Sequence, residues 1–288
     1  VEAGVPAGVI SVVHGSGSVV GKTLTSSKKV DMVSLTGSTA AGIDAAKNCA
    51  EHCAHSSLEL GGNDAFILCA DGDMDLAIEE TVWGRLYNTG QVCCASKRFL
   101  IENSVKEEYI RRMVEKINSL KQGNPQDIST DIGCLVSEEA AIEVERQVNE
   151  TIKAGATLVC GGKRNGAFYE PTILDNVTKD MEVAKDMEIF GPVISVIGFD
   201  DLEEAIAIAN QSIYGLSGSI ITKDISKAIK VSEKMECGGF VINGASFFRS
   251  FEQPFGGWKY SGIGNEGIMT TLKEMSRTKT VILKNITK

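Results

Sequence analysis

The sequence lacks a long apolar run, a leader segment and a cluster of basic residues, and each shortage excludes a class of protein. No apolar stretch in the 288 residues approaches the ~20 needed to cross a bilayer, so we expect no membrane partner. The chain begins at Val1 without an initiator Met or a charged-then-apolar leader. We therefore expect no targeting signal, and we interpret the start as part of a longer chain.

The charge balance is acidic, with a net charge of −9. Basic residues are grouped only in short pairs such as Arg111-Arg112. Nucleic-acid phosphates must be neutralised by clustered Lys and Arg, so we expect no nucleic-acid partner. The apolar and charged fractions are typical of an ordinary globular protein, and this length allows one or two domains.

The eight cysteines lack the spacing of a disulfide scaffold. We expect reduced thiols and a cytoplasmic protein. Cys49, His52 and Cys53 lie at helical spacing with His55 just beyond, which could be read as a metal site. No second Cys/His cluster completes such a site, so we favour small thiols on the buried face of an Ala-rich helix and expect no metal.

Strand and helix patterns alternate along the chain, which predicts an α/β fold with a parallel sheet. A long C-terminal segment continues the pattern after the Gly61-Gly62 turn, and the tail at residues 278–283 alternates like a lone strand paired outside its own domain. Strands are expected at residues 9–13, 30–35, 57–60, 65–68, 97–101, 193–199 and 238–243, and helices at 40–55, 75–89, 105–120, 138–154 and 202–210.

The first candidate for chemistry is Cys93, within Asn-x-Gly-Gln-x-Cys at residues 88–93. A thiol just after a helix, beside Gly and small residues, is accessible to a substrate and to backbone N–H groups. As a thiolate it would attack a carbonyl carbon. Residue type alone favours another interpretation, in which Cys93 and Cys94 pack as small apolar groups.

The second candidate is Glu59, which is followed by Leu60, Gly61 and Gly62. A carboxylate at the end of a parallel strand lies where α/β folds place their sites. Partial burial would raise its pKa and suit it to general-base work on water. The alternative is a surface Glu before an ordinary glycine turn.

Two glycine turns could hold a dinucleotide. Gly15, Gly17 and Gly21 are one residue off the usual G-x-G-x-x-G spacing and are weak evidence. The turn at Gly37 and Ser38 follows a strand and opens a helix, whose N-terminal N–H groups favour phosphate. Ser38 could equally be a simple N-cap.

Together these motifs resemble the aldehyde dehydrogenase superfamily along essentially the whole chain. The glutamate signature matches residues 58–62 and the cysteine signature matches residues 88–93. In amino-acid sequence, residues 92–99 look most like the succinate-semialdehyde and lactaldehyde dehydrogenase branch. Further matches, in the same order as in the family, are residues 35–39, 188–193, 214–217 and 254–262, with Asn210.

The resemblance implies oxidation of an aldehyde to a carboxylic acid with NAD or NADP. Cys93 would attack the aldehyde, with its own N–H forming part of the oxyanion hole, and a thioester would follow. Glu59 would activate the water that hydrolyses this thioester. Coenzyme A-acylating relatives lack this glutamate, so release of a free acid is favoured.

The resemblance also implies which residues hold the cofactor. Gly37 and Ser38 would lie against the pyrophosphate and Leu60 beneath the nicotinamide. Two further residues would fix the nicotinamide ribose. The full expected cofactor set is Gly37, Ser38, Gly42, Leu60, Glu188 and Phe190.

The resemblance divides the chain into parts with different roles. Residues 1–62 would be the C-terminal part of the cofactor domain, and residues 63–255 the catalytic domain. Residues 256–275 would return to the cofactor domain, and residues 276–288 would form an oligomerisation strand in a homodimer or homotetramer. Family members are longer at the N-terminus, so half of the cofactor site and the choice between NAD and NADP lie outside this sequence.

The substrate is expected to be a small aldehyde, with succinate semialdehyde as the specific candidate. Arg249 lies in a loop near the expected substrate entrance and could pair with a substrate carboxylate, although a solvated loop arginine is the simpler interpretation. The family's usual Lys after Gly62 is replaced by Asn63-Asp64, and a usual Arg near the tail by Asn265. Alternatives are a dinucleotide-binding member without catalysis and a purely structural role in an assembly.

Overall fold

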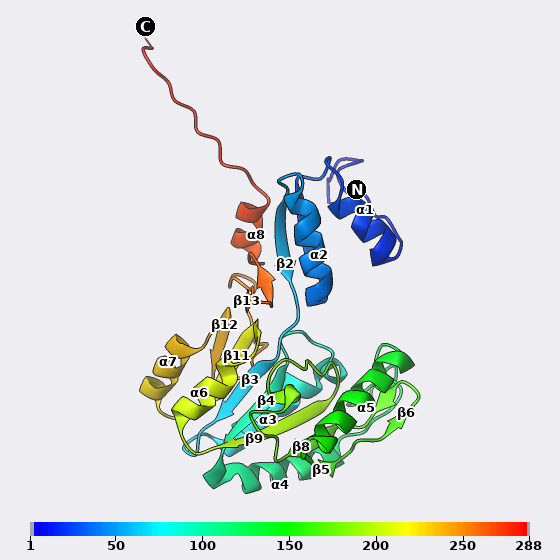
Figure 1. Cartoon of the computed structure of the whole chain (residues 1–288), viewed down its shortest axis with the longest axis vertical. Coiled ribbons are helices and arrows are strands. Elements are labelled where there is room, and N and C mark those ends of the chain that lie inside the picture. Colours follow the sequence, from blue (N-terminus) through cyan, green and yellow to red (C-terminus); the bar gives the residue numbers. More distant parts are fainter. Residues whose placement is uncertain (1–2, 287–288) are drawn as a thin grey trace.

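The computed structural model describes residues 3–286, which form two lobes (Figure 1). The chain crosses between them from β2 to β3 and again from β12 to β14. The large lobe contains a seven-stranded sheet in the order β12-β11-β3-β4-β9-β8-β5. Its strands run parallel except β5, which pairs antiparallel with β8. The strands are β3 (Asp64–Leu68), β4 (Ser96–Glu102), β5 (Thr157–Cys160), β8 (Thr172–Asp175), β9 (Val193–Phe199), β11 (Ser217–Ile221) and β12 (Gly239–Ile242).

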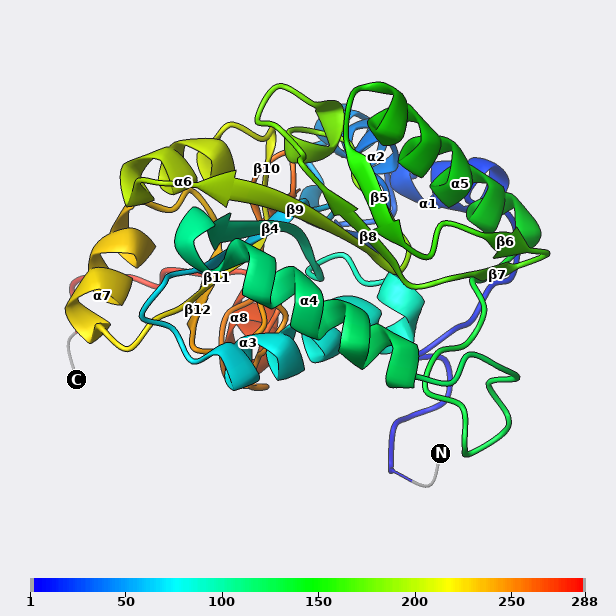
Figure 2. The ribbon, with the colours of Figure 1, turned by 90° about the horizontal axis from the view of Figure 1, so that it is seen from below.

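Helices cover both faces of this sheet, as the view from below shows (Figure 2). Successive residues of a strand point to opposite faces, so β3 contributes Ala65 and Ile67 to one core and Phe66 and Leu68 to the other. One face packs against α3 (Met74–Thr81) and α4 (Asn103–Ser119). The other packs against α5 (Glu138–Lys153), α6 (Leu202–Asn210) and α7 (Ile225–Lys234).

The small lobe is built on a three-stranded sheet in the order β1-β2-β14. Strands β1 (Met32–Thr36) and β2 (His55–Glu59) are parallel and are connected through α2 (Thr39–Ala50). The chain returns to this lobe late, because β14 (Gly262–Ile263) pairs antiparallel with β2 and α8 (Ile268–Glu274) follows it. At the start of the described chain lie η1 (Gly17–Gly21) and α1 (Lys22–Thr25).

Short elements complete the structure around the two main sheets. The pairs β10 (Tyr214–Gly215) with β13 (Trp258–Lys259), and β6 (Arg164–Asn165) with β7 (Phe168–Tyr169), form small antiparallel ribbons. After α3 the chain continues as η2 (Val82–Leu86) and η3 (Tyr87–Gly90), and η4 (Glu182–Ala184) precedes β9.

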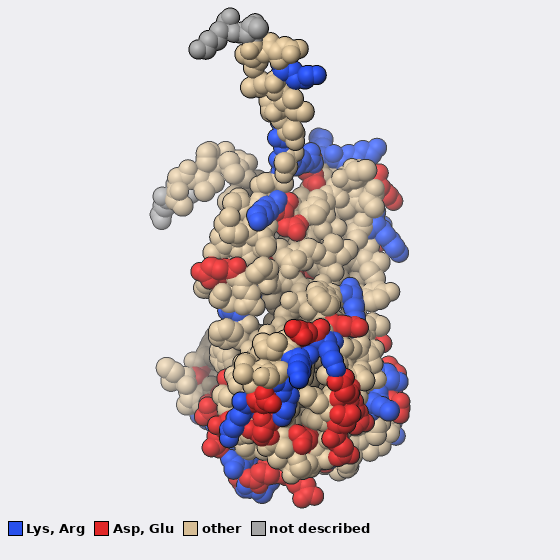
Figure 3. All heavy atoms as spheres, turned by 90° about the vertical axis from the view of Figure 1, so that its left-hand side faces the viewer, with Lys and Arg blue, Asp and Glu red and all other residues tan. Residues whose placement is uncertain are grey.

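Charged side chains of both signs are intermingled on the large lobe in the face shown in Figure 3. Among the ion pairs of this lobe, Lys234 pairs with Glu203, and Lys227 pairs with Asp71 at 2.8 Å. The protruding C-terminal tail is mostly uncharged in the same view, and Val281, Ile282 and Leu283 are exposed. No helix in the described part of the chain is long and apolar enough to cross a membrane.

The parallel α/β architecture confirms the expected fold, and several elements fall where the sequence predicted them. Strand β9 and helix α6 match the predicted bounds to the residue. The helix expected at 75–89 is shorter, because α3 gives way to η2 and η3, where Asn88 and Thr89 adopt left-handed backbone angles. Helix α7 and strands β5, β8 and β11 were not predicted.

The strand expected at residues 9–13 is wrong. This segment has no strand pairing, and Val9, Val12 and Val13 are exposed. A β-branched run becomes a strand only when a neighbouring strand accepts its backbone hydrogen bonds, and no described strand lies beside it. The tail at residues 278–283 also has no strand partner among residues 3–286, so its pairing outside the chain stays a prediction.

Candidate active site

Cys93 lies in the tight turn between η3 and β4, next to Gly62 in the segment that joins β2 to β3. Three consecutive residues before it, Asn88, Thr89 and Gly90, have positive φ angles. At Gly90 φ is +76°, and a β-carbon there would lie 2.3 Å from the Gly191 carbonyl oxygen. Only glycine meets both demands, which explains its place in the cysteine signature.

The side chains of Asn88 and Gln91 fix this turn. The Asn88 amide donates to the Gln91 carbonyl at 3.1 Å, and the Gln91 amide donates back to the Asn88 carbonyl at 3.0 Å. The Gln91 amide oxygen also accepts from the Val136 N–H at 2.8 Å. The residues of the Asn-x-Gly-Gln-x-Cys signature therefore build the rigid turn that presents Cys93.

Gly61 and Gly62 carry the chain from Glu59 past Cys93 and Glu188. A β-carbon at Gly62 would lie 2.9 Å from the Cys93 carbonyl oxygen, and one at Gly61 would lie 2.4 Å from a Glu188 carboxylate oxygen. The Gly62 N–H donates to Glu188 Oε1 at 3.1 Å. The glycine pair thus lets the two sequence signatures and Glu188 approach one another.

Lys97 lies beneath the cysteine turn and is 2% exposed. Its amino group donates to the carbonyls of Cys93 at 2.6 Å and Val92 at 3.1 Å, and lies 3.3 Å from Glu188 Oε1. The segment that contains Glu188 is also held from below. Arg85 donates to the carbonyls of Ile189 and Val193, which follow Glu188 in the chain.

The environment of Cys93 favours its thiolate. A hydrogen bond from the Cys94 thiol is the main cause, and the Lys97 charge and the Cys94 N–H add to it against the opposing effect of burial; together they lower the Cys93 pKa to about 6. The pKa of the Cys94 thiol is raised, because that thiol keeps its proton while it donates to Cys93. Cys93 is therefore the activated member of the pair.

The environment of Glu59 shifts its pKa in the opposite direction and favours the protonated carboxyl. Burial, reinforced by the nearby Glu266 and Cys93 and opposed by Arg249, raises its pKa to about 8. The side chain is 4% exposed, and neither carboxyl oxygen has a hydrogen-bond partner among the described residues. A buried polar group without a partner is costly, so Glu59 is held at this position by its surroundings rather than by its own contacts.

The structure places the expected cofactor residues on both lobes. Ser38 is the N-cap of α2, as its hydroxyl accepts from the Ala41 N–H at 3.3 Å. This is the simpler of the two roles considered for Ser38, and it leaves the helix N-terminus exposed beside Gly37. Gly42 packs directly against Leu60, since a β-carbon at Gly42 would lie 2.4 Å from Leu60 Cδ2.

Glu188 and Phe190 complete this set from the large lobe. The Phe190 ring is 44% exposed, while Glu188 is partly buried against Gly61 and Gly62. The exposed N-terminus of α2, the unhindered approach at Gly37 and the exposed Phe190 ring suit a group with phosphate and an aromatic face. The residues present are therefore compatible with a dinucleotide.

Arg249 lies close to Glu59, but it already has partners. Its guanidinium lies 4.1 Å from the centre of the Phe255 ring, and Nη2 lies 3.8 Å from Glu266 Oε2. Arg249 and Glu266 also line a cavity of about 380 Å³ that reaches Ser34 and Ser57 of the small lobe. A substrate anion at Arg249 would have to compete with Glu266.

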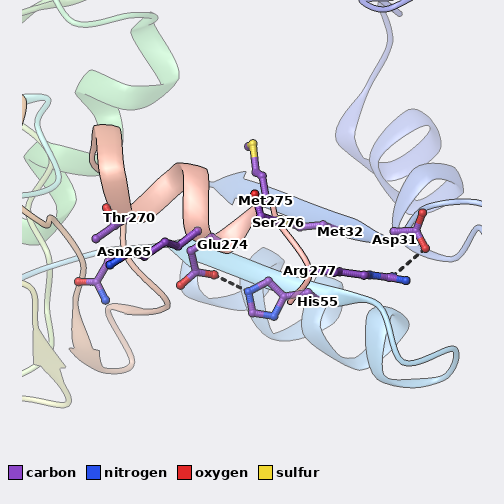
Figure 4. Close-up of a pocket in the computed structure, with 10 residues that line it drawn as sticks. Asp31, Met32, His55, Asn265, Thr270, Glu274, Met275, Ser276 and Arg277 are labelled. Carbon is purple, nitrogen blue, oxygen red and sulfur yellow. Dashed lines mark hydrogen bonds and ion pairs between the residues drawn. The ribbon is translucent and has the colours of Figure 1, made fainter. Parts of the chain in front are cut away.

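A cavity of about 520 Å³ lies on the small lobe, away from Cys93 (Figure 4). Two ion pairs cross it: His55 with Glu274, and Arg277 with Asp31 at 2.9 Å. None of the expected site residues lines it. Neither Cys93, whose pKa is lowered, nor Glu59, whose pKa is raised, lines this cavity.

The cysteine and histidine group at residues 49–55 extends beyond the end of α2, so its members do not share one helix. Helix α2 ends at Ala50, and Cys49 is buried while Cys53 is exposed. Within residues 3–286, no group of three or more His, Cys, Asp or Glu side chains could hold a metal ion.

Three residues of the site were not singled out from the sequence: Lys97, Asp64 and Glu266. Asp64 is 2% exposed, and its pKa is raised to about 8 by burial, against the lowering effects of Lys97 and the Ser217 N–H. The sequence signals were weak, since Asp64 was noted only as a departure from the family. Lys97 was part of the quoted motif without a role.

The α/β fold thus carries a thiol whose pKa is lowered, a buried carboxyl whose pKa is raised and an exposed helix N-terminus. Comparison with known proteins makes this more specific. The sequence model described as "Aldehyde dehydrogenase family" matches residues 1–281, and the chain belongs to this family.

Individual proteins similar to this chain are also named as dehydrogenases of aldehydes. A lactaldehyde dehydrogenase of Methanococcus aeolicus is 40% identical over 279 residues, which cover 97% of this chain and 59% of the relative. The betaine aldehyde dehydrogenase of Staphylococcus aureus, solved with NAD+, has a TM-score of 0.90 at 38% identity, covering 95% of this chain and 55% of that one. A glyceraldehyde-3-phosphate dehydrogenase of Methanocaldococcus jannaschii, solved with NADP, has a TM-score of 0.90 at 40% identity, covering 94% and 58%. The chain thus spans less than two thirds of the length of these relatives.

Proposed function

We propose that this chain carries the thiol chemistry of an NAD- or NADP-dependent aldehyde dehydrogenase that converts a small aldehyde to a carboxylic acid. The observation that carries the proposal is the pairing of an activated Cys93 with a buried Glu59 whose pKa is raised to about 8. Two titratable groups with oppositely shifted pKa values at one site are typical of divided nucleophile and base roles.

In the first step the Cys93 thiolate attacks the aldehyde carbon, and the oxygen gains negative charge. The Cys93 N–H supplies part of the stabilisation of this oxyanion. The bound nicotinamide would supply the hydride acceptor that turns the adduct into a thioester on Cys93.

In the second step Glu59 removes a proton from a water molecule, which attacks the thioester carbon. The acid is released and Cys93 regains its thiolate. Glu59 must be ionised for this step, so hydrolysis should increase as the pH rises through about 8.

The cofactor would be held by residues of both lobes. Gly37 and Ser38 would lie against the pyrophosphate at the N-terminus of α2, and Leu60, packed on Gly42, would support the nicotinamide. Glu188 and Phe190 would orient the nicotinamide ribose. The relatives solved with NAD+ and with NADP support either cofactor.

We propose that the chain is divided between cofactor binding, catalysis and assembly. Residues 1–62 and 256–275 would form the cofactor part, residues 63–255 the catalytic part and residues 276–288 an oligomerisation strand. The pairing of β14 with β2 supports the return at residues 256–275. The exposed apolar residues Val281 and Ile282 support an intermolecular role for the tail in a homodimer or homotetramer. The eight free cysteines support a cytoplasmic location.

Succinate semialdehyde remains a candidate substrate, with Arg249 as the partner of its carboxylate. The names of the relatives, lactaldehyde and 3-sulfolactaldehyde dehydrogenase, support a short polar aldehyde in general. Arg249 would bind the carboxylate only by giving up Glu266, which limits the expected gain.

The test is aldehyde-dependent reduction of NAD or NADP by the purified protein and by a Cys93→Ala variant. We expect the variant to lose all turnover while it still binds cofactor, as measured by fluorescence titration. Turnover by Cys93→Ala at the wild-type rate would contradict the proposal. Cofactor binding by both proteins with no turnover by either would favour a binding member without catalysis.

A further inference from the structure

The amino group of Lys97 is surrounded by carbonyls of the cysteine turn. Besides its bonds to Cys93 and Val92, it lies 3.5 Å from the Ala95 carbonyl oxygen. A lysine amino group has three donors that can be distributed over separate acceptors. The planar guanidinium of an arginine cannot reproduce this arrangement, because its donors lie in one plane.

The peptide geometry links these contacts to the reacting face of the turn. The described chain has no cis peptide bonds, so each carbonyl points opposite to the N–H of the same peptide unit. The Val92 carbonyl shares its peptide unit with the Cys93 N–H, and the Cys93 carbonyl shares its unit with the Cys94 N–H. When Lys97 holds the two carbonyls, both N–H groups are turned away from it.

The two N–H groups have different roles at the site. The Cys94 N–H stabilises the Cys93 thiolate. The Cys93 N–H has no acceptor among residues 3–286, which leaves it available to a ligand. Cys93 is only partly buried, so this N–H can reach a ligand beside the nucleophile.

We infer that Lys97 is a positioning residue, which orients the Cys93 N–H toward the reacting carbonyl and the Cys94 N–H toward the Cys93 thiolate, and which places a positive charge beneath that thiolate. The inference rests on the proposed thiol chemistry of Cys93. Lys97 does not touch the substrate; it acts through the turn.

Lys97 also joins the cysteine turn to the expected cofactor residue. Glu188 Oε1 accepts from the Gly62 N–H and lies 3.3 Å from the Lys97 amino group. Asp64 adds a second buried carboxyl, whose Oδ1 accepts from the Ser217 N–H at 3.0 Å and whose Oδ2 has no partner among the described residues. The positive charge of Lys97 therefore acts on Cys93, Glu188 and Asp64 together.

A purely structural role for Lys97 is the competing explanation. In that case Lys97 only neutralises Asp64 and Glu188 in the protein interior. Its replacement would then lower the melting temperature but leave the thiol reactivity of Cys93 unchanged. The two explanations differ in the pH dependence of one chemical reaction, alkylation of Cys93.

The experiment measures the rate of Cys93 alkylation by iodoacetamide against pH, with the modified peptide quantified by mass spectrometry. The variants are Lys97→Met, which removes charge and donors, and Lys97→Gln, which keeps amide donors without charge. Lys106→Met is the matched control, because Lys106 is also a partly buried lysine in an ion pair, with Asp175 at 2.8 Å, outside the cysteine turn.

We expect the wild type and Lys106→Met to share one profile with a midpoint near pH 6. Lys97→Met should raise this midpoint by about one unit, because an opposite charge close to a group shifts its titration by about that much or more. Its alkylation should then be about tenfold slower at pH 5 and about twofold slower at pH 7. Lys97→Gln should fall between them if the donors and the charge both contribute.

Unchanged alkylation profiles in folded Lys97→Met would overturn the inference. If that variant fails to fold, Lys97→Gln decides in the same way: slower alkylation supports the inference and a wild-type profile overturns it. Alkylation requires neither aldehyde nor cofactor. A failure of the aldehyde dehydrogenase proposal, seen as turnover without Cys93, is therefore distinguishable from a failure of this one.

Discussion

The large and small lobes differ in how completely the chain covers its own strands. Phe66 in β3 and Phe99 in β4 are fully buried, and helices cover both sheet faces of the large lobe. In the small lobe β1 alternates between half-buried and exposed residues, and the segment at residues 9–13 is exposed. Cys93 therefore belongs to the lobe whose strands are buried on both faces, whereas Glu59 belongs to the lobe whose strands are partly exposed.

The largest difference is expected from core truncation. Phe99→Ala should lower the free energy of unfolding by about 3–5 kcal/mol, because it removes a fully buried ring from the sheet. Val12→Ala, at a residue 76% exposed, should change it by less than about 0.5 kcal/mol. Urea denaturation measures both. Equal losses would show that the small-lobe segment is packed in solution, which would break the comparison.

A smaller difference is expected from two glycines at turns. Gly90→Ala should cost about 2–3 kcal/mol, because φ is +76° and the β-carbon would collide with the Gly191 carbonyl. Gly37→Ala is the control in the small lobe, where the nearest atom to the β-carbon would be 3.9 Å away. We expect thermal melting to separate the two variants. A Gly90→Ala protein as stable as Gly37→Ala would contradict the described turn.

Ionisation of the buried Glu59 carboxyl should lower the free energy of unfolding. The pKa of Glu59 is raised from 4.5 to about 8, so the native state holds a proton that the unfolded chain releases between these values. Stability should therefore fall as the pH rises from about 4.5 to 8, and Glu59→Gln should reduce this fall by on the order of 1–3 kcal/mol. Urea unfolding at several pH values measures it. A parallel pH dependence in wild type and variant would show that Glu59 is solvated.

The smallest effect is expected at Arg249, at the junction of the lobes. Arg249→Gln should lower kcat/KM for succinate semialdehyde about tenfold more than for a neutral aldehyde of similar size, if Arg249 binds the carboxylate. Steady-state kinetics with both aldehydes decide this. Equal losses for the two substrates would remove Arg249 from the substrate site and leave it as a partner of Glu266.

The same difference between lobes explains which predictions from sequence succeeded. Strand β9 was located to the residue because a parallel strand buried on both faces is a continuous apolar run. The segment at residues 9–13 has a similar composition, but a strand also needs a neighbour, which its own sequence does not specify. Helix α7 was missed although Asp224 caps it, because its short apolar face was not separated from the adjacent strands.

At the site, the sequence singled out the residues with the proposed roles of nucleophile and base. Cys93 and Glu59 were found through local signatures that build a turn and a strand end. Lys97 and Asp64 could not be assigned roles, because their importance depends on burial beneath a turn formed by residues from several strands. A charged residue in a strand pattern is indistinguishable from a surface residue until the neighbouring strands are placed.

The most direct test of the account is the chemical state of Cys93 during turnover. A Glu59→Gln protein is mixed with aldehyde and NAD or NADP, quenched, digested and mapped by mass spectrometry. The account predicts that the peptide containing Cys93 gains the mass of the acyl group and that hydroxylamine removes it. An unmodified Cys93 while the aldehyde is still oxidised, or an acyl group on Cys94 instead, would contradict it.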